Sequence, residues 1–188
     1  MSVDRSVLQW MVDHRTPLST DVVTAVTHTG GTIAVFTVTA VVSLVLLARR
    51  RTTDAVLVAG AMLSGWALMA GLKQVFGRVR PPVPDRLVLL DSYAFPSGHA
   101  MMTAILACVL GAVVVRVVAA GVRRSVLLAV LASYTLAVGL SRVYLAAHWL
   151  TDVLAGWAIG AAWAAVWIGA TYRWARRSAT AATRPPRM

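Results

Sequence analysis

The chain has 188 residues, of which 59% are hydrophobic and only 13% are charged. This apolar content is larger than the core of a soluble domain of this length requires, so the composition excludes a soluble or disordered chain and indicates one compact membrane protein. The formal net charge of +11 would also suit a nucleic-acid binder. The distribution of the charges along the chain, however, is better explained by membrane topology.

The first 29 residues carry too many charges for a cleaved signal peptide or a membrane span. The charged residues that fall where an apolar segment would be needed are Asp4, Arg5, Asp13, Arg15 and Asp21. Apolar residues between them recur at helical spacing, which indicates short helices lying on the membrane surface. The sequence therefore predicts an N-terminal interfacial helical segment over residues 1–29.

Five apolar stretches follow, and each approaches the roughly 20 residues that cross a bilayer. They cover residues 30–48, 55–72, 100–122, 125–140 and 153–172. The predicted fold class is all-α: a polytopic membrane helix bundle of five transmembrane helices plus the N-terminal interfacial helices. We expect a transmembrane domain over residues 30–175 and a basic cytoplasmic tail over residues 176–188, disordered from residue 179 onward.

The loops between five spans alternate between the two sides of the membrane, and the charges are divided unequally between these sides. One side holds eleven arginines and one aspartate, whereas the other holds seven basic and six acidic residues. The positive-inside rule places the first side in the cytoplasm, with the N-terminus outside and the C-terminus inside the plasma membrane. The basic excess therefore reflects topology, and no nucleic-acid partner is expected.

The second apolar stretch ends in a pair of cations, Lys73 and Arg80. Lys73 is the only lysine among eighteen basic residues, which suggests that a flexible ammonium is specifically needed there. A spacing of seven is about two helical turns and would let both cations face one anion, although Gly77 and the proline after Arg80 favour unwinding. The alternative is that both snorkel to the interface, and this interpretation is kept for Arg78 and Arg86.

Ser97, Gly98 and His99 stand where a proline-containing loop meets the third apolar stretch. Serine is a favourable N-cap, and the backbone N–H groups at a helix start bind anions. Gly98 would let a ligand approach the backbone closely, and His99 would point at that ligand from the first turn. A capped helix with an interfacial histidine is the alternative.

Arg142, His148 and Asp152 lie between the fourth and fifth apolar stretches, where ionisable groups are costly unless they are paired or used. A spacing of four predicts that His148 and Asp152 share one helical face, with the carboxylate accepting the proton of one imidazole nitrogen. A histidine held in this way is a competent nucleophile, and Arg142 offers a bidentate donor for an anion. A membrane-edge anchor is the alternative; a metal site is disfavoured because the chain has no glutamate.

The three groups fall on the nearly neutral side of the predicted topology, and together they resemble the signature of the type 2 phosphatidic acid phosphatase superfamily. This superfamily includes lipid phosphate phosphatases, bacterial acid phosphatases and vanadium haloperoxidases. The residues that match its three motifs are, in chain order, Lys73, Arg80 and Pro81; Pro96, Ser97, Gly98 and His99; and Ser141, Arg142, His148 and Asp152. The order and spacing of the three motifs carry the resemblance.

The resemblance implies a metal-independent hydrolase that needs no cofactor and works through a phosphohistidine. His148 would attack phosphorus, Asp152 would orient it, and His99 would protonate the leaving group. The residues that would bind phosphate are Lys73, Arg80, Ser97, Gly98 and Arg142. Because one histidine must be neutral and the other protonated, we expect a bell-shaped pH dependence of kcat/KM.

The implied substrate is a membrane lipid phosphate or diphosphate: phosphatidic acid, phosphatidylglycerophosphate or a polyprenyl (di)phosphate, acted on at the extracytoplasmic face. Two alternatives remain, a vanadate-dependent haloperoxidase and a non-catalytic lipid-phosphate binder or transporter.

Gly156 and Gly160 permit a close helix contact, either inside the bundle or in a homodimer. His14 and His28 have no spaced partner and are left outside the site.

Overall fold

The computed structural model describes residues 2–182, and within them the regular structure is entirely helical, with no strand. The α-helices are α1 (Val3–Asp13), α2 (Pro17–Thr29), α3 (Thr32–Ala48), α4 (Thr52–Phe76), α5 (Gly98–Val117), α6 (Val122–Tyr144) and α7 (Leu150–Ala182), with a short 3₁₀ helix at Val83–Asp85. The predicted all-α membrane bundle is therefore confirmed.

Four helices, α4 to α7, are long and apolar enough to cross a bilayer. The helix α3 has only 17 residues, but α2 and α3 together qualify as one span that is bent by 45°. The bend falls at Gly30 and Gly31, which the sequence suggested as the start of a span rather than its middle. The first span can thus include α2, which packs along α6, and the interfacial position of residues 1–29 stays a prediction.

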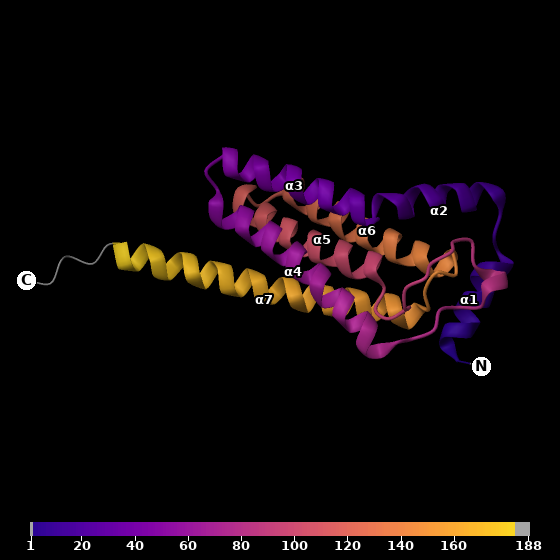
Figure 1. Cartoon of the computed structure of the whole chain (residues 1–188). Coiled ribbons are helices and arrows are strands. Elements are labelled where there is room, and N and C mark those ends of the chain that lie inside the picture. Colours follow the sequence, from indigo (N-terminus) through magenta and orange to yellow (C-terminus); the bar gives the residue numbers. More distant parts are fainter. Residues whose placement is uncertain (1, 183–188) are drawn as a thin grey trace, which may run out of the picture.

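The helix α5 runs through the middle of the bundle and is packed by α3, α4, α6 and α7 (Figure 1). Its side chains Met101, Ile105 and Val109 are fully buried, in one apolar cluster with Leu57 and Val58 of α4. A larger share of α5 than of α4, α6 or α7 is buried inside the protein, and α5 therefore forms the core of the membrane domain.

Gly156 and Gly160 of α7 face α5 and let the two backbones approach. A Cβ at Gly156 would lie 2.9 Å from the carbonyl oxygen of Ser97, and one at Gly160 would lie 2.6 Å from that of Met101. The pair therefore serves the packing of the bundle itself. The possible homodimer stays a prediction.

We expect Gly160→Ala to lower the free energy of unfolding by about 1–3 kcal/mol, because the added methyl must push α7 away from the backbone of α5. Gly169→Ala on the same helix is the control, since no atom lies within 4 Å of its Cβ. Alanine favours a helix over glycine, so the control should melt at an unchanged or slightly higher temperature. Thermal unfolding in detergent measures both, and equal melting temperatures would contradict the close contact.

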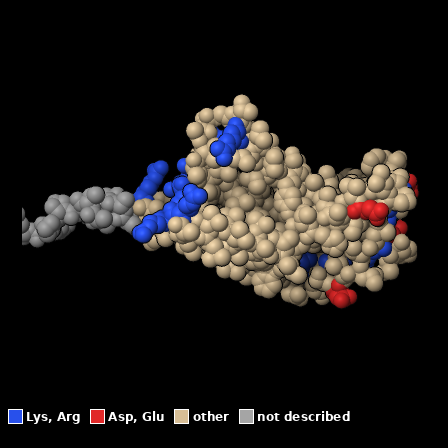
Figure 2. Space-filling view, turned by 90° about the horizontal axis from the view of Figure 1, so that it is seen from above, with Lys and Arg blue, Asp and Glu red and all other residues tan. Residues whose placement is uncertain are grey.

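Charged side chains gather at the two ends of the bundle, on either side of an uncharged belt (Figure 2). The arginine-rich end contains Arg49, Arg50, Arg51, Arg116, Arg123, Arg124, Arg173, Arg176 and Arg177. Buried Asp54 accepts hydrogen bonds there from Arg51 and Arg116, each at 3.0 Å. The guanidinium of Arg116 also lies 4.1 Å from the ring centroid of Tyr172, so this network joins α4, α5 and α7.

The helix α7 projects beyond the bundle to Ala182 (Figure 1). Residues 179–182, which were expected to be disordered, are therefore helical, and the reason is their alanine content, which favours a helix. The rest of the predicted basic tail, residues 183–188, lies outside the described residues.

Candidate active site

The ends of α4, α5, α6 and α7 meet at the end of the bundle opposite the arginine-rich one. The helix α4 ends at Phe76 because Gly77 adopts the left-handed conformation, with φ of 54°. The predicted unwinding before Arg80 is thus confirmed. The loop that follows is held to its surroundings, since Leu87 N–H donates to the carbonyl of Leu145 at 3.1 Å.

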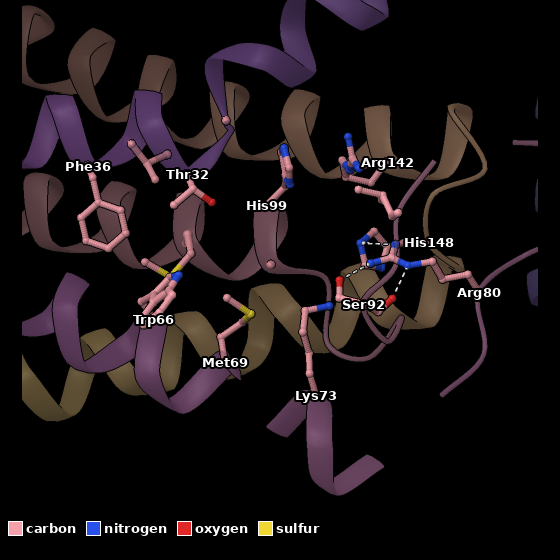
Figure 3. Close-up of a pocket in the computed structure, with 15 residues that line it drawn as sticks. Thr32, Phe36, Trp66, Met69, Lys73, Arg80, Ser92, His99, Arg142 and His148 are labelled. Carbon is pink, nitrogen blue, oxygen red and sulfur yellow. Dashed lines mark hydrogen bonds between the residues drawn. The ribbon is translucent and has the colours of Figure 1, made fainter. Parts of the chain in front are cut away.

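A cavity of about 190 Å³ opens among these helix ends (Figure 3). Charged and imidazole side chains from the three sequence motifs line one side of it: Lys73, Arg80, His99, Arg142 and His148. The other side is apolar and includes Val35, Phe36, Trp66, Met69 and Met102. In Figure 3, Phe36 and Trp66 lie at the end away from His148, so the cavity is polar at one end and apolar at the other.

Arg80 is buried and holds the loop against His148. Its Nε donates to the carbonyl of Ser92 at 2.6 Å, and its Nη1 donates to the carbonyl of Ala147 at 2.6 Å. Nη1 also lies 3.2 Å from Nε2 of His148. Burial lowers the pKa of Arg80 to about 10, so the guanidinium remains charged at neutral pH.

Besides Nδ1 of His148, two buried polar atoms of the predicted site residues have no hydrogen-bond partner among the described residues. Arg142 is held from α2, where Thr27 Oγ1 accepts from its Nη1 at 2.7 Å, but its Nε is unpaired. Ser97 is the N-cap residue of α5, yet its side chain makes no capping bond and its Oγ is also unpaired. Buried polar groups are rarely left unsatisfied in proteins, so both atoms suit a ligand that accepts hydrogen bonds.

His148 lies in the turn before α7, not on a helix, so the predicted helical face shared with Asp152 is wrong. Their proximity has another cause: Asp152 Oδ2 accepts the N–H of Trp149 at 2.9 Å, in the manner of a capping box. This places Oδ2 at 3.7 Å from Nδ1 of His148, beside the imidazole but beyond hydrogen-bond distance.

His148 is only 2% exposed. This burial lowers its pKa to about 4; Asp152 opposes the shift, and the cations Arg80, Arg142 and Lys73 reinforce it. His148 is therefore neutral at pH 7, as a nucleophile must be.

Arg78 was interpreted from the sequence as a snorkelling cation, but it is paired with two carboxylates, one of which belongs to Asp4 near the N-terminus. Arg78 Nη1 donates to Asp152 Oδ1 at 2.5 Å and to Thr151 Oγ1 at 2.7 Å, while its Nη2 donates to Asp4 Oδ2 at 2.8 Å. Asp4, on α1, also accepts from the N–H and hydroxyl of Thr151, at 2.9 and 2.7 Å. The only signal for Arg78 was its position two residues before Arg80, and no pattern in the sequence pointed to Asp4.

Comparison with known proteins gives consistent matches. The model of the PAP2 superfamily matches residues 54–177. Phosphatidylglycerophosphatase B of Bacillus subtilis (strain 168) is 30% identical over 160 residues, which cover 85% of this chain and 78% of that protein. The residues matched by the family model include every charged and imidazole side chain of the cavity, whereas Asp4 and Thr27 precede them.

Two crystal structures share the fold. One is the first transmembrane PAP2 type phosphatidylglycerolphosphate phosphatase from Bacillus subtilis, with a TM-score of 0.82, 27% identity and coverage of 90% of this chain and 85% of that one. The other is Aquifex aeolicus LpxE, with a TM-score of 0.71, 21% identity and coverage of 90% and 96%. The latter likeness concerns the fold alone.

Proposed function

Because the chain belongs to the PAP2 superfamily, we propose that it is a membrane phosphatase that removes a phosphate group from a lipid whose apolar tail stays in the bilayer. The observation that carries the proposal is the two-ended cavity, with cations and imidazoles around His148 and apolar side chains toward Phe36 and Trp66. Such a cavity suits an amphiphile, because the phosphate and the first part of the tail meet walls of matching chemistry.

In the proposed reaction, Nε2 of His148 attacks phosphorus in line with the ester bond. The phosphorus–nitrogen bond forms as the phosphorus–oxygen bond breaks, and the departing alkoxide takes a proton from His99. Water then attacks the phosphohistidine, gives a proton to His99 and releases inorganic phosphate. Asp152 orients the imidazole, and the lowered pKa of His148 keeps the attacking nitrogen unprotonated.

The proposed phosphate site consists of Lys73, Arg80, Ser97, Gly98 and Arg142. The unpaired Arg142 Nε and Ser97 Oγ support it, since both are free to donate to phosphate oxygens. Phosphoryl transfer spreads negative charge over three equatorial oxygens, and fixed cations stabilise that charge. At 4 Å and an effective dielectric of 20, each cation would contribute about 4 kcal/mol, and no metal ion is then required.

We further propose that the site faces the extracytoplasmic side of the plasma membrane. The support is the arginine cluster at the opposite end of the bundle, which suits the cytoplasmic side. Phosphatidylglycerophosphate is the first candidate substrate, because a relative at 30% identity is named for its hydrolysis. Phosphatidic acid and polyprenyl diphosphates are the next candidates.

A phosphate-release assay tests this function. The purified protein in mixed micelles is given phosphatidylglycerophosphate, phosphatidic acid, a polyprenyl diphosphate or glycerol 3-phosphate, which has no tail, each with and without a chelator. We expect a kcat/KM at least about 100-fold higher for the preferred lipid than for glycerol 3-phosphate, since each buried methylene contributes about 0.8 kcal/mol. Absence of release from every lipid would refute the function, and strong chelator inhibition would refute its metal independence.

A further inference from the structure

Next to His148, the first turns of two helices and a loop are joined by a closed network of hydrogen bonds. Its members are Asp4 of α1, Arg78 of the loop after α4, and Thr151 and Asp152 at the start of α7. Asp4 receives three donors, one from Arg78 and two from Thr151, and is only 9% exposed. A buried carboxylate with this many charge-assisted and neutral bonds has a fixed position.

The guanidinium of Arg78 connects this fixed carboxylate to the one that faces His148. One nitrogen, Nη2, binds Asp4, and the other, Nη1, binds Asp152 Oδ1. The second oxygen of Asp152, Oδ2, is held by the N–H of Trp149 and is the one beside the imidazole. Both oxygens of Asp152 are therefore held from outside the cavity, and the plane of its carboxylate depends on Arg78.

We propose that Asp4 and Arg78 are positioning residues of the reaction. Through these two residues, α1 fixes the carboxylate of Asp152, and this carboxylate in turn orients the imidazole of His148. This inference rests on the proposed function, in which His148 is the nucleophile. It makes the N-terminal helix part of the catalytic apparatus, although α1 precedes residues 54–177, which carry the family match. The packing of α1 against α6 and α7 supplies the rigid base that such a role needs.

Steady-state kinetics on four variants give the first test, with the substrate that the wild type prefers. We expect kcat to fall about 10-fold in Asp4→Asn and about 100-fold in Arg78→Gln, because small misplacements of a reacting group are that costly, while KM stays within about twofold. Arg78→Lys should lose nearly as much as Arg78→Gln, since one ammonium cannot bridge two carboxylates. The control is Asp13→Asn on the same helix: Asp13 is exposed and bonds only to Gln9, at 2.7 Å, so its kcat should not change.

The pKa of His148, measured by NMR of the imidazole signals, is the second test and does not depend on activity. The chain has four histidines, and the His148→Ala spectrum identifies the signal. The charged and titratable groups that face His148 are Lys73 of α4, Arg80 of the loop, His99 of α5, Arg142 of α6 and Asp152 of α7. Arg78→Gln leaves the charge of Asp152 without its partner, so the pKa of His148 should rise; Arg78→Lys should bring it back toward the wild-type value.

The outcomes separate the two proposals. If neither the wild type nor Asp13→Asn releases phosphate from any lipid, the proposed function fails while the NMR titration still reports on the network. If the wild type is active and Asp4→Asn and Arg78→Gln keep its kcat, the positioning role is overturned. Loss of kcat with an unmoved pKa in Arg78→Gln would also overturn it, because a merely structural role predicts that result. If Asp4→Asn does not fold, Arg78→Lys decides alone, and an undiminished kcat refutes the inference.

Discussion

Replacing the proposed nucleophile, in His148→Ala, is expected to lower kcat for phosphate release by about 10⁴-fold or more, as removal of a nucleophile does in other covalent hydrolases. The cations of the cavity remain in this variant, so substrate should still bind. The fold should also persist, because Arg80, which loses its contact with Nε2 of His148, keeps its hydrogen bonds to the carbonyls of Ser92 and Ala147. Phosphate release, together with the melting temperature in detergent, measures both effects.

A chemical readout sharpens this test. With a lipid labelled in its phosphate group, rapid quenching should trap an acid-labile, base-stable label on the wild type and none on His148→Ala. The control is His14→Ala, because His14 is exposed and contacts only its own helix, through Trp10. If His148→Ala released phosphate at the wild-type rate, or carried the same label, another residue would be the nucleophile.

The second large effect is expected for Arg142→Lys, which keeps the positive charge but removes the planar donor group. We expect kcat/KM to fall by about 10²- to 10³-fold, the usual cost of losing one donor that stabilises transition-state charge. The lost donor is Nε, which is buried and has no partner among the described residues. A lysine ammonium cannot reproduce its direction.

Two controls accompany the Arg142 variant. Arg5→Lys makes the same exchange at an exposed position of α1 and should leave kcat/KM unchanged. Thr27→Val removes only the hydroxyl that holds Arg142 Nη1 and should give a smaller loss than Arg142→Lys. An Arg142→Lys enzyme with wild-type kcat/KM would show that charge alone, and not the guanidinium geometry, is used.

The gathering of the three motifs could be predicted from the sequence, because it depends on local signals. Apolar stretches fix the number of spans to within one, and their alternation places Lys73, His99 and His148 at the same end of the bundle. The structure brings these three side chains to one cavity. Their catalytic roles stay predictions until the variants above are measured.

The features that could not be predicted depend on tertiary contacts. Asp4 and Thr151 are 147 residues apart in the sequence, so no spacing rule connects them. The prediction that His148 and Asp152 share a helical face was wrong for another reason. A spacing of four fits a helix, but Asp152 accepts a capping bond from the N–H of Trp149, and α7 begins only at Leu150. The role of the pair Gly156 and Gly160 likewise required knowledge of which helix lies opposite.

The network around Asp54 at the arginine-rich end has a mechanical consequence for the distant cavity. The helices that it joins, α4, α5 and α7, are the ones that present Lys73, His99 and Asp152 at the other end. The helix α4 has 25 residues and is therefore about 37 Å long, at 1.5 Å per residue. A tilt of this helix by about 3° about one end would move its other end by about 2 Å. Asp54, Arg116 and Tyr172 thus connect, at the arginine-rich end, the same three helices whose opposite ends carry Lys73, His99 and Asp152.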